Sequence, residues 1–523
     1  MRRVLIERLL PLAVLLCGCG ADLGDASLSG SSYRPDAGAS KSDPEGAGGA
    51  SASDGGLPPE KEIESDYEAP VATGNVVWIA NPKSGRVALV DAQTLAVKTV
   101  EAGNAPTYLA SVPNQPVDTT LVLNVLSADA TLLKSTPTGI QTATFKTAQQ
   151  ANSTVFSSDG RFAIVWADAR KTPSALKTQG FQDLTILDLS TGASTILAVG
   201  YRPVAVGFAA SASGASPVQA YAVTQDGIAL IDLGAAPVVT RNVAISETPT
   251  EDPGTRDVFV TKAGDRAFIR RDGSSKITVV TLATDARAEI ELTGPVTDLD
   301  LADTGDRAVA VVRDTAKVSV LSIADPGNPK DFEVAGETIG SVAIAPGGGK
   351  ALLYTNATAS ERFTILDLGQ SQLRTVRLYS PVLGIFSTPD AQHAIVLHDQ
   401  TETATEGAFS VVPIGQNLPA KIVATQAKPT AVATLDDRAV IAERDDARKV
   451  YGAHLVRMPQ LMSERYALAS PPIAVGTVPN ARRAFIAQQH PEGRLTFIDL
   501  ESGIARTLTG FELSSRVVDG SRP

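Results

Sequence analysis

Short apolar runs separated by turn-forming residues fill the chain from Asn75 onward. Val76–Asn81 and Arg86–Asp91 are two such runs, with Pro, Lys, Ser and Gly between them. The runs are short and rich in β-branched residues, a pattern that predicts strands rather than helices. Sets of four runs joined by Gly, Asp, Asn and Pro turns are typical of four-stranded antiparallel sheets.

This set of runs recurs about every 40 to 50 residues, the signature of a propeller or a solenoid. Tracing it gives about ten units, whose second strands are expected to start near Val76, Thr120, Phe162, Gln219, Ala267, Ala308, Ala351, Ala394, Ala439 and Ala484. We therefore predict an all-β fold, a β-propeller of four-stranded blades over residues 73–523. Propellers usually have fewer blades, so two rings in tandem, or weak units that are insertions, stay alternatives to a single large ring.

The two ends of the repeat region lead to a prediction about ring closure. The first unit starts at its second strand, and an unmatched strand follows the last unit near Ser515–Val518. We expect these two strands to pair in one sheet, because sealing the ring in this way would remove exposed strand edges.

The first unit also resembles a known repeat. Val77-Trp78-Ile79-Ala80-Asn81, Gly85-Arg86-Val87-Ala88-Leu89-Val90-Asp91 and Gly103-Asn104-Ala105-Pro106 are similar to a YVTN-type propeller repeat. Later units keep the Asp at the end of the third strand but mostly lose the Asn. The resemblance implies a propeller fold and a cell-surface setting, and it implies no particular reaction.

The N-terminus has the plan of a bacterial lipoprotein signal peptide. Arg2 and Arg3 precede an apolar run from Leu9 to Leu16, which is too short for a permanent membrane span. The sequence Leu16-Cys17-Gly18-Cys19 resembles a lipobox. Residues 1–18 are thus expected to be a signal peptide, and Cys19 the lipidated residue. Residues 19–72, rich in Gly, Ser, Ala and Asp, are expected to be a disordered tether.

Charge and cysteine content narrow the possible settings. The net charge of −11 combines +2 in residues 1–18 with −8 in residues 19–72, which leaves only −5 for the rest. A nucleic-acid-binding protein needs a basic surface, so we expect no nucleic-acid partner. Both cysteines, Cys17 and Cys19, precede the propeller, which therefore cannot contain an intramolecular disulfide.

Most repeated polar residues have an architectural explanation. Carboxylates that end the third strands can accept hydrogen bonds from the turn amides that follow; they are Asp188, Asp232, Asp367 and Asp499. The pairs Asp265-Arg266, Asp306-Arg307 and Asp437-Arg438 are expected to be solvated turn residues. Trp78 and Trp166 are expected to be core residues. Four histidines and no nucleophile or zinc motif give little support to catalysis.

One set of residues offers chemistry at the central channel. Asp257, Asp298 and Ser341 each lie nine residues before a basic turn residue in three consecutive units. They are expected at the inner ends of the innermost strands, where they would form a binding site at the channel mouth. Asp257 and Asp298 would converge there and could bind a divalent cation as cofactor. The alternative is that they are solvated strand ends.

These observations favour a non-catalytic binding or protein-interaction module. It would be anchored by its acyl chains to a lipid membrane of the cell envelope. The outer membrane is the expected location, because Gly20 rather than Asp follows Cys19. Its partner would be an envelope protein or a polysaccharide. The alternative function is that of a lactonase-like propeller hydrolase, with channel carboxylates holding a divalent metal, and this rests on fold analogy alone.

Overall fold

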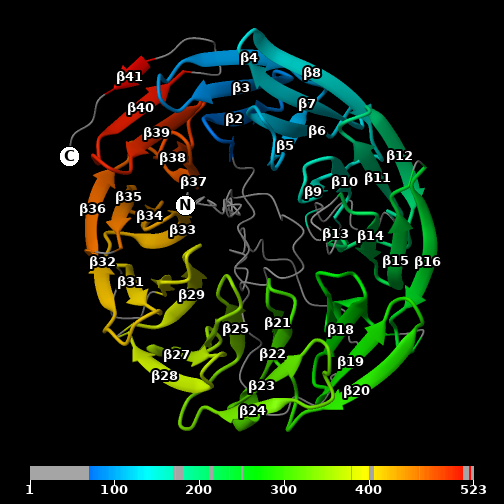
Figure 1. The fold of residues 1–523 in the computed structure, drawn as a ribbon. Coiled ribbons are helices and arrows are strands. Elements are labelled where there is room, and N and C mark those ends of the chain that lie inside the picture. The colour runs from blue at the N-terminus through cyan, green and yellow to red at the C-terminus, as the bar shows by residue number, and fades with distance from the viewer. Residues whose placement is uncertain are drawn as a thin grey trace, which may run out of the picture.

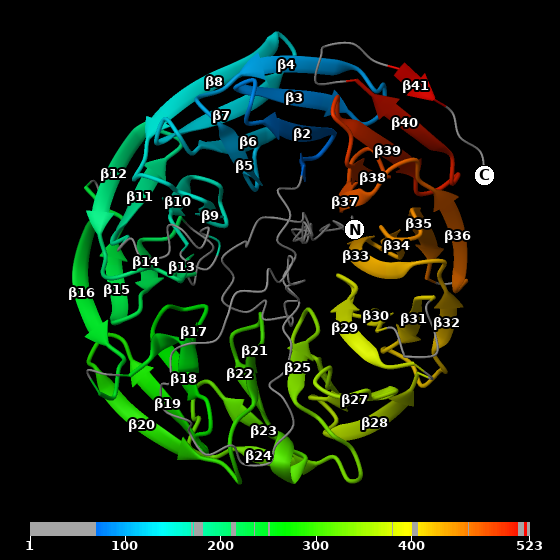
Figure 2. The same cartoon turned by 180° about the vertical axis from the view of Figure 1, so that it is seen from behind.

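A computed structural model describes residues 70–168, 171, 181–210, 216–234, 236–248, 251–378, 380–399, 406–458, 460–510 and 517–519. In this part of the chain ten antiparallel sheets form a closed ring (Figures 1 and 2). Nine sheets have four strands and the last has five. The fold is thus a ten-bladed propeller, as the sequence predicts. The signal peptide, Cys19 and nearly all of the tether lie outside the described residues.

Each blade contributes one strand to each of four concentric layers. The innermost strands are β1 (Val71–Ala72), β5 (Pro106–Ser111), β9 (Ser153–Phe156), β13 (Ala205–Phe208), β17 (Arg256–Val260), β21 (Asp298–Leu301), β25 (Ser341–Ile344), β29 (Val382–Ser387), β33 (Lys428–Leu435) and β37 (Pro472–Val478). The second strands are β2 (Val76–Asn81), β6 (Thr119–Asn124), β10 (Phe162–Trp166), β14 (Gln219–Val223), β18 (Arg266–Arg271), β22 (Arg307–Val312), β26 (Lys350–Tyr354), β30 (His393–His398), β34 (Arg438–Asp445) and β38 (Arg483–Gln488).

The third strands are β3 (Arg86–Asp91), β7 (Asp129–Thr136), β11 (Asp183–Asp188), β15 (Gly227–Asp232), β19 (Lys276–Thr281), β23 (Lys317–Ser322), β27 (Arg362–Asp367), β31 (Ala408–Pro413), β35 (Val450–Arg457) and β39 (Arg494–Asp499). The outer strands are β4 (Val97–Glu101), β8 (Gly139–Lys146), β12 (Ala193–Ala198), β16 (Val238–Ala244), β20 (Ala286–Glu291), β24 (Lys330–Glu333), β28 (Gln372–Arg377), β32 (Lys421–Ala424), β36 (Met462–Ala467) and β40 (Ala505–Thr509), and β41 (Val517–Asp519) follows β40. Two 3-10 helices, η2 (Pro253–Thr255) and η3 (Arg313–Thr315), are described as well. No helix within the described ranges is long and apolar enough to cross a membrane.

The second strands carry the clearest sequence signal because neighbouring blades cover both of their faces. Phe162–Trp166 and Thr119–Asn124 are buried throughout, whereas the outer strand Ala193–Ala198 has only exposed and half-buried residues. A continuous apolar run is what a strand buried on both faces requires. All ten second strands start within one residue of the predicted positions. Trp78 and Trp166 are buried, as expected.

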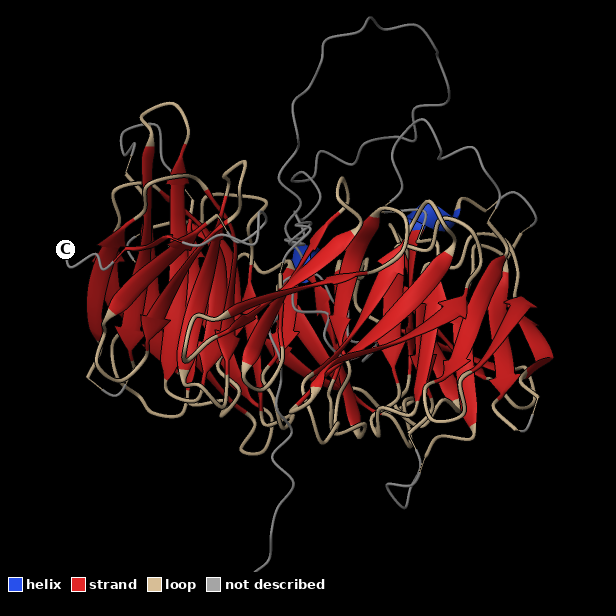
Figure 3. Ribbon diagram, turned by 90° about the horizontal axis from the view of Figure 1, so that it is seen from above, coloured by secondary structure: helices blue, strands red, loops and turns tan. Residues whose placement is uncertain are grey.

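The ring has two faces of different construction (Figure 3). The antiparallel strand order places the connections between blades and the turns between second and third strands on one face, which we call the interblade face. The turns between first and second strands and between third and outer strands lie on the opposite face, which we call the hairpin face. Loops on a rigid scaffold of this kind commonly carry binding sites.

The core consists of ten apolar clusters, each of which joins two neighbouring blades. The cluster that closes the ring joins blade 10 to blade 1 and includes Phe485, Phe497, Val77 and Val90. The Asn480 amide donates to the Gly74 carbonyl across the same junction, with an N–O distance of 2.9 Å. The ring is therefore closed by side-chain packing.

Closure differs from the sequence prediction, which paired the strand near Ser515–Val518 with the first unit. Blade 1 has its own innermost strand, because Val71–Ala72 pairs with Val77 and Trp78. Val517–Asp519 instead pairs with Thr507–Thr509 on the outer edge of blade 10. The prediction was wrong because two residues suffice for the innermost strand of blade 1, and so short a run gives no recognisable periodicity.

Arginines at the start of second strands join neighbouring blades on the hairpin face. Arg307 and Arg438 each donate to a carbonyl in the third-strand turn of the following blade, at Leu368 (3.5 Å) and Leu500 (3.3 Å). Arg266 bonds Ile323 in the same way, and Arg483 of blade 10 bonds Ala92 of blade 1. The sequence analysis interpreted these Asp-Arg pairs as solvated turn residues. This interpretation fits the aspartates but misses the contact of each arginine with the next blade.

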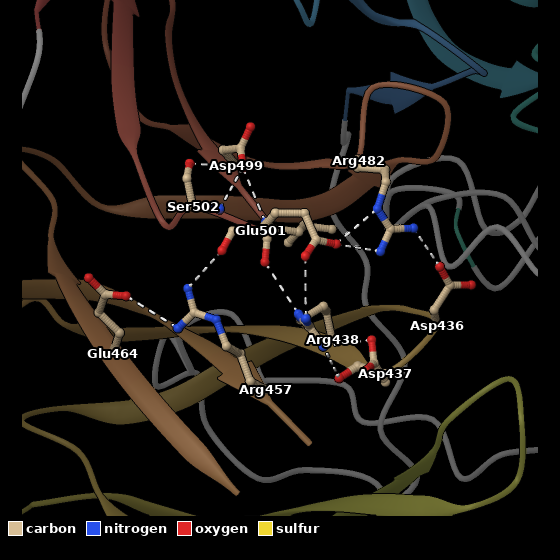
Figure 4. A network of polar contacts seen from close by, with 10 residues as sticks. Asp436, Asp437, Arg438, Arg457, Glu464, Arg482, Asp499, Glu501 and Ser502 are labelled. Carbon is tan, nitrogen blue, oxygen red and sulfur yellow. Dashed lines mark hydrogen bonds and ion pairs between the residues drawn. The ribbon is translucent and has the colours of Figure 1, made fainter. Parts of the chain in front are cut away.

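A polar network on the hairpin face lies between blades 9 and 10 (Figure 4). Arg482 contacts Asp436 at 2.8 Å and Glu501 at 2.7 Å, and Arg438 lies 3.6 Å from Glu501. Asp499 accepts hydrogen bonds from the turn amides of Glu501 and Ser502, as predicted for this class of residue. The network therefore fixes the turns of the two blades against one another.

Candidate functional site

The predicted channel-mouth residues do lie at equivalent places in the ring. Asp257, Asp298 and Ser341 stand at or next to the interblade-face ends of the innermost strands β17, β21 and β25. These strands belong to the consecutive blades 5, 6 and 7, and Figure 2 shows them bordering the centre of the ring. Ser341 is buried, with 4% of its surface exposed.

A guanidinium group lies among the carboxylates of this region. Arg270, which pairs with Asp257 across β17 and β18, forms ion pairs with Asp257 and with Asp272 (2.9 Å). Burial would lower the pKa of Arg270, but the charges of Asp257, Asp272 and Asp298 outweigh burial and raise it. A cation at Asp257 and Asp298 would therefore compete with Arg270. The described residues contain no group of three or more His, Cys, Asp or Glu that could hold a metal ion, and cation binding at this pair stays a prediction.

Asp298 and Asp300 lie on one side of β21, as strand alternation predicts, and both contact blade 7. The Val342 amide donates to Asp298 Oδ2 at 2.7 Å, and the Ile344 amide donates to Asp300 Oδ2 at 2.8 Å. An innermost strand has no sheet neighbour on its channel side, so its amides need other acceptors. Asp300 is only 1% exposed. Asp300 is therefore not a solvated strand end, and it attaches blade 6 to blade 7.

The same junction contains a hollow on the interblade face that the sequence did not indicate. Its volume is about 650 Å³, within the range of ordinary ligand sites. The connection between β24 and β25, the loop between β26 and β27, and the end of β28 form its walls. The lining residues are Gly336, Glu337, Thr338, Thr358, Ala359, Ser360, Glu361, Arg362, Thr375 and Arg377.

Two arginines on neighbouring strands lie side by side in the wall of the hollow. Arg362 on β27 is the direct antiparallel partner of Arg377 on β28, and like charges in this arrangement repel. Glu337, whose side chain is 11% exposed, accepts from Arg362 Nη1 at 2.9 Å. The hollow thus combines two arginines and two glutamates with hydroxyl side chains, an arrangement suited to a polar ligand.

His398 makes structural contacts inside blade 8. His398 is fully buried; its Nδ1 donates to the Pro381 carbonyl at 3.1 Å and its Nε2 accepts from Ser410 Oγ at 2.7 Å. Burial lowers the pKa of His398 to about 4. His393 stands five residues earlier on the same strand, so the two imidazoles point to opposite faces of the sheet. A metal site made by this pair is therefore excluded by strand geometry.

A buried carboxylate in blade 9 fixes another connection between blades. Glu443 is fully buried; it accepts from Arg465 Nε at 2.6 Å and from the amides of Gln426 and Ala427 at 2.8 and 3.2 Å. His454 Nε2 lies 3.4 Å away. Burial would raise the pKa of Glu443, but the hydrogen bonds and charges of His454 and Arg465 lower it overall. The network holds the connection from blade 8 against blade 9.

The hollow was missed although one signal for it was available. The turn after Asp367 fixes the register of β27 and β28, because it pairs Asp367 with Gln372. Five pairs further from the turn, Arg362 is then paired with Arg377. The contribution of Glu337 could not be found in this way, because it comes from another blade through a connection of irregular length.

Comparison with known proteins adds little to this picture. No protein-family model and no curated protein matches the chain. Hydrazine synthase of Kuenenia stuttgartiensis is similar to it with 11% identity and a TM-score of 0.31, over 53% of this chain and 99% of that one. Dihydro-heme d1 dehydrogenase NirN in complex with DHE is similar with 11% identity and a TM-score of 0.39, over 76% of this chain and 73% of that one. Apo AztD from Citrobacter koseri is similar with 12% identity and a TM-score of 0.35, over 60% of this chain and 87% of that one. The likeness is confined to the fold.

Proposed function

We propose that this chain is a lipid-anchored protein of the bacterial cell envelope and that its propeller is a non-catalytic binding module. The observation that carries the binding role is the hollow of about 650 Å³ between blades 6 and 7. Its lining is mainly polar, and its wall contains the Glu337–Arg362 ion pair. Binding there needs no rearrangement of the ring, because packed blades and the Asp298 and Asp300 contacts hold the junction in place.

A substitution that fills the hollow tests the binding role. Thr375 is exposed and lines the hollow, whereas Thr144 is exposed on the outer strand of blade 2, far from it. The full chain with Cys19→Ser, labelled and free of its anchor, is titrated with envelope fractions from cells that lack the protein. Thr375→Trp should abolish saturable binding and Thr144→Trp should preserve it.

Each other outcome would reject part of the proposal. Binding that survives Thr375→Trp would exclude the hollow as the binding site. The absence of saturable binding by the chain that carries Cys19→Ser alone would reject the binding role.

The anchor is proposed from Leu16-Cys17-Gly18-Cys19. Cys19→Ser should release the protein from membranes and prevent its labelling by a radioactive acyl chain. Cys17→Ser, two residues away, is the matched control and should leave both properties unchanged. If Cys17→Ser releases the protein and Cys19→Ser does not, the lipidated residue is Cys17. Density fractionation should place the anchored protein in the outer membrane.

A further inference from the structure

We propose that this protein forms a twofold symmetric dimer through β12, the outer strand of blade 3, which pairs antiparallel with β12 of a second copy. The two blades then join into one continuous sheet. This inference goes beyond the proposed binding role, because it concerns the outer rim of the ring and does not involve the hollow. It rests on the exposed edge of β12, on the absence of charge from this strand and on the symmetry of its residues.

The outer edge of β12 presents backbone groups to solvent. β12 ends the sheet of blade 3 at the rim of the ring (Figure 1), and no strand in the described part of the chain pairs with its outer side. The Val199 amide continues the pairing of β12 with β11 and donates to the Gln182 carbonyl, with an N–O distance of 2.8 Å. Hydrogen-bonded pairs alternate along an antiparallel ladder. Ser194, Ile196 and Ala198 therefore direct their amide and carbonyl groups away from the blade, and all three residues are exposed.

Blade 10 provides an example of an outer edge that holds a further strand. The Gly510 amide donates to the Gly493 carbonyl, so the same alternation makes Thr507 and Thr509 face outward from β40. These two residues are among those that pair with β41. The rim of the ring therefore has room for an added antiparallel strand.

The sequence of β12 lacks the charges that protect the other outer edges. β12 is the only one of the ten outer strands without a charged residue, and its Ile196 is 50% exposed. Charged side chains on an edge strand oppose pairing with another chain. On β20, by contrast, the outward residues are Arg287, Glu289 and Glu291. A twofold pair of β20 strands would place Glu289 opposite Glu289, and like charges in this arrangement repel.

The symmetry of β12 fits it to a second copy of itself. In a twofold antiparallel pair centred on Ile196, this residue lies opposite its counterpart and Ser194 lies opposite Ala198 of the second copy. Outward residues then meet outward residues, and each opposed pair exchanges two backbone hydrogen bonds. Gly192 and Gly200, which both have positive φ, end the strand and would lie opposite each other without side chains to obstruct the pairing.

Sedimentation velocity of the full chain that carries Cys19→Ser tests the dimer. A reducing buffer prevents a disulfide between the Cys17 thiols of two copies. We expect a dimer that forms as the concentration is raised. Ile196→Lys places two like charges opposite each other and should weaken the dimer about tenfold or more. Ile196→Pro removes the central amide donor from both strands and should weaken it by about the same factor; an edge strand tolerates Pro where the amide faces solvent.

The matched control is Ile422→Lys on β32, the outer strand of blade 8. Ile422 is 41% exposed, and its amide also faces outward, but Lys421 lies beside it. Ile422→Lys should leave the dimer unchanged, and near-UV circular dichroism should show that all variants are folded. A chain that stays monomeric at every concentration would overturn the inference. A dimer that Ile196→Lys leaves intact, or that Ile422→Lys disrupts equally, would overturn it too.

Hydrogen–deuterium exchange at single amides distinguishes strand pairing from any other contact between copies. The outward amides of Ser194, Ile196 and Ala198 should exchange slowly in the dimer and rapidly in the chain with Ile196→Lys. The amides of Thr195 and Leu197 bond β11 and should exchange slowly in both. A dimer in which the three outward amides exchange as fast as in the chain with Ile196→Lys would show that the copies do not pair through this edge.

Discussion

Closure of the ring by side-chain packing predicts the effect of one core substitution in blade 10. Phe485 is 1% exposed in the cluster that joins blade 10 to blade 1. Its ring lies over Gly476, where an added Cβ would come within 2.4 Å of it. Replacing a buried Phe by Ala costs about 3–5 kcal/mol of unfolding free energy, so Phe485→Ala should destabilise the ring by this amount.

The corresponding change in melting temperature can be worked out from the size of the propeller. Unfolding entropy is about 2.1 cal/mol/K per residue. For a folded body of roughly 440 residues this gives about 0.9 kcal/mol/K, so Phe485→Ala should lower the melting temperature by about 3–5 °C. Among the contacts that the structure describes, deletion of residues 511–523 removes the pairing of β41 with the outer edge of β40. It should cost about 1 kcal/mol or less.

Differential scanning calorimetry on three variants decides the point. Phe268→Ala, at a fully buried phenylalanine in the cluster of blades 5 and 6, is the matched control. Phe485→Ala and Phe268→Ala should destabilise the protein to a similar extent, and the deletion should leave the transition almost unchanged. A deletion that destabilises as much as Phe485→Ala would refute closure by packing. A melting temperature that Phe485→Ala leaves unchanged would also refute closure by packing.

Three further predictions concern polar groups in the ring. The pKa of buried His398 is lowered from 6.5 to about 4. As the pH falls, this imidazole is therefore protonated in the unfolded chain before it is protonated in the folded one. The free energy of unfolding that His398 contributes is complete above pH 6.5 and is lost as the pH falls to 4. This amounts to about 3 kcal/mol; urea titrations at pH 7 and pH 4.5 should show it, and His398→Gln should remove most of the difference. Asp300→Ala should cost about 1–3 kcal/mol, because a buried amide loses its acceptor, while Asp303→Ala, at an exposed turn contact, should cost under about 1 kcal/mol; equal losses would contradict the role of Asp300. Gly452→Ala should cost about 1–3 kcal/mol, since its Cβ would come within 2.4 Å of buried Glu443; an unchanged urea midpoint would show that the network can move aside.

The blade pattern could be predicted from the sequence because it depends on local signals. The second strands, such as Phe162–Trp166, are continuous apolar runs bounded by turns, and turn acids such as Asp188 mark where the third strands end. Closure could not be predicted in the same way. A two-residue strand at Val71–Ala72 carries no periodicity, and only the packed structure shows that blade 1 is complete without help from β41.

The candidate site depends on contacts between blades, which sequence spacing does not give. Asp298 was correctly placed at the end of an innermost strand, but its acceptor role towards Val342 requires knowledge of how blade 7 lies against blade 6. The hollow needs the same knowledge, because Glu337 reaches Arg362 from a connection between blades. The predicted pairing of β27 with β28 could have revealed only that Arg362 and Arg377 are cross-strand neighbours.

The central claim is that ligands bind at the interblade face of the junction between blades 6 and 7. Hydrogen–deuterium exchange of the full chain, with and without an envelope extract that binds it, tests this claim most directly. We predict slower exchange in residues 336–338, 358–362 and 375–377, and unchanged exchange in the hairpin-face turns at 303–306 and 345–349 of the same two blades. Slower exchange in those turns or at another junction, with no change around the hollow, would contradict the claim.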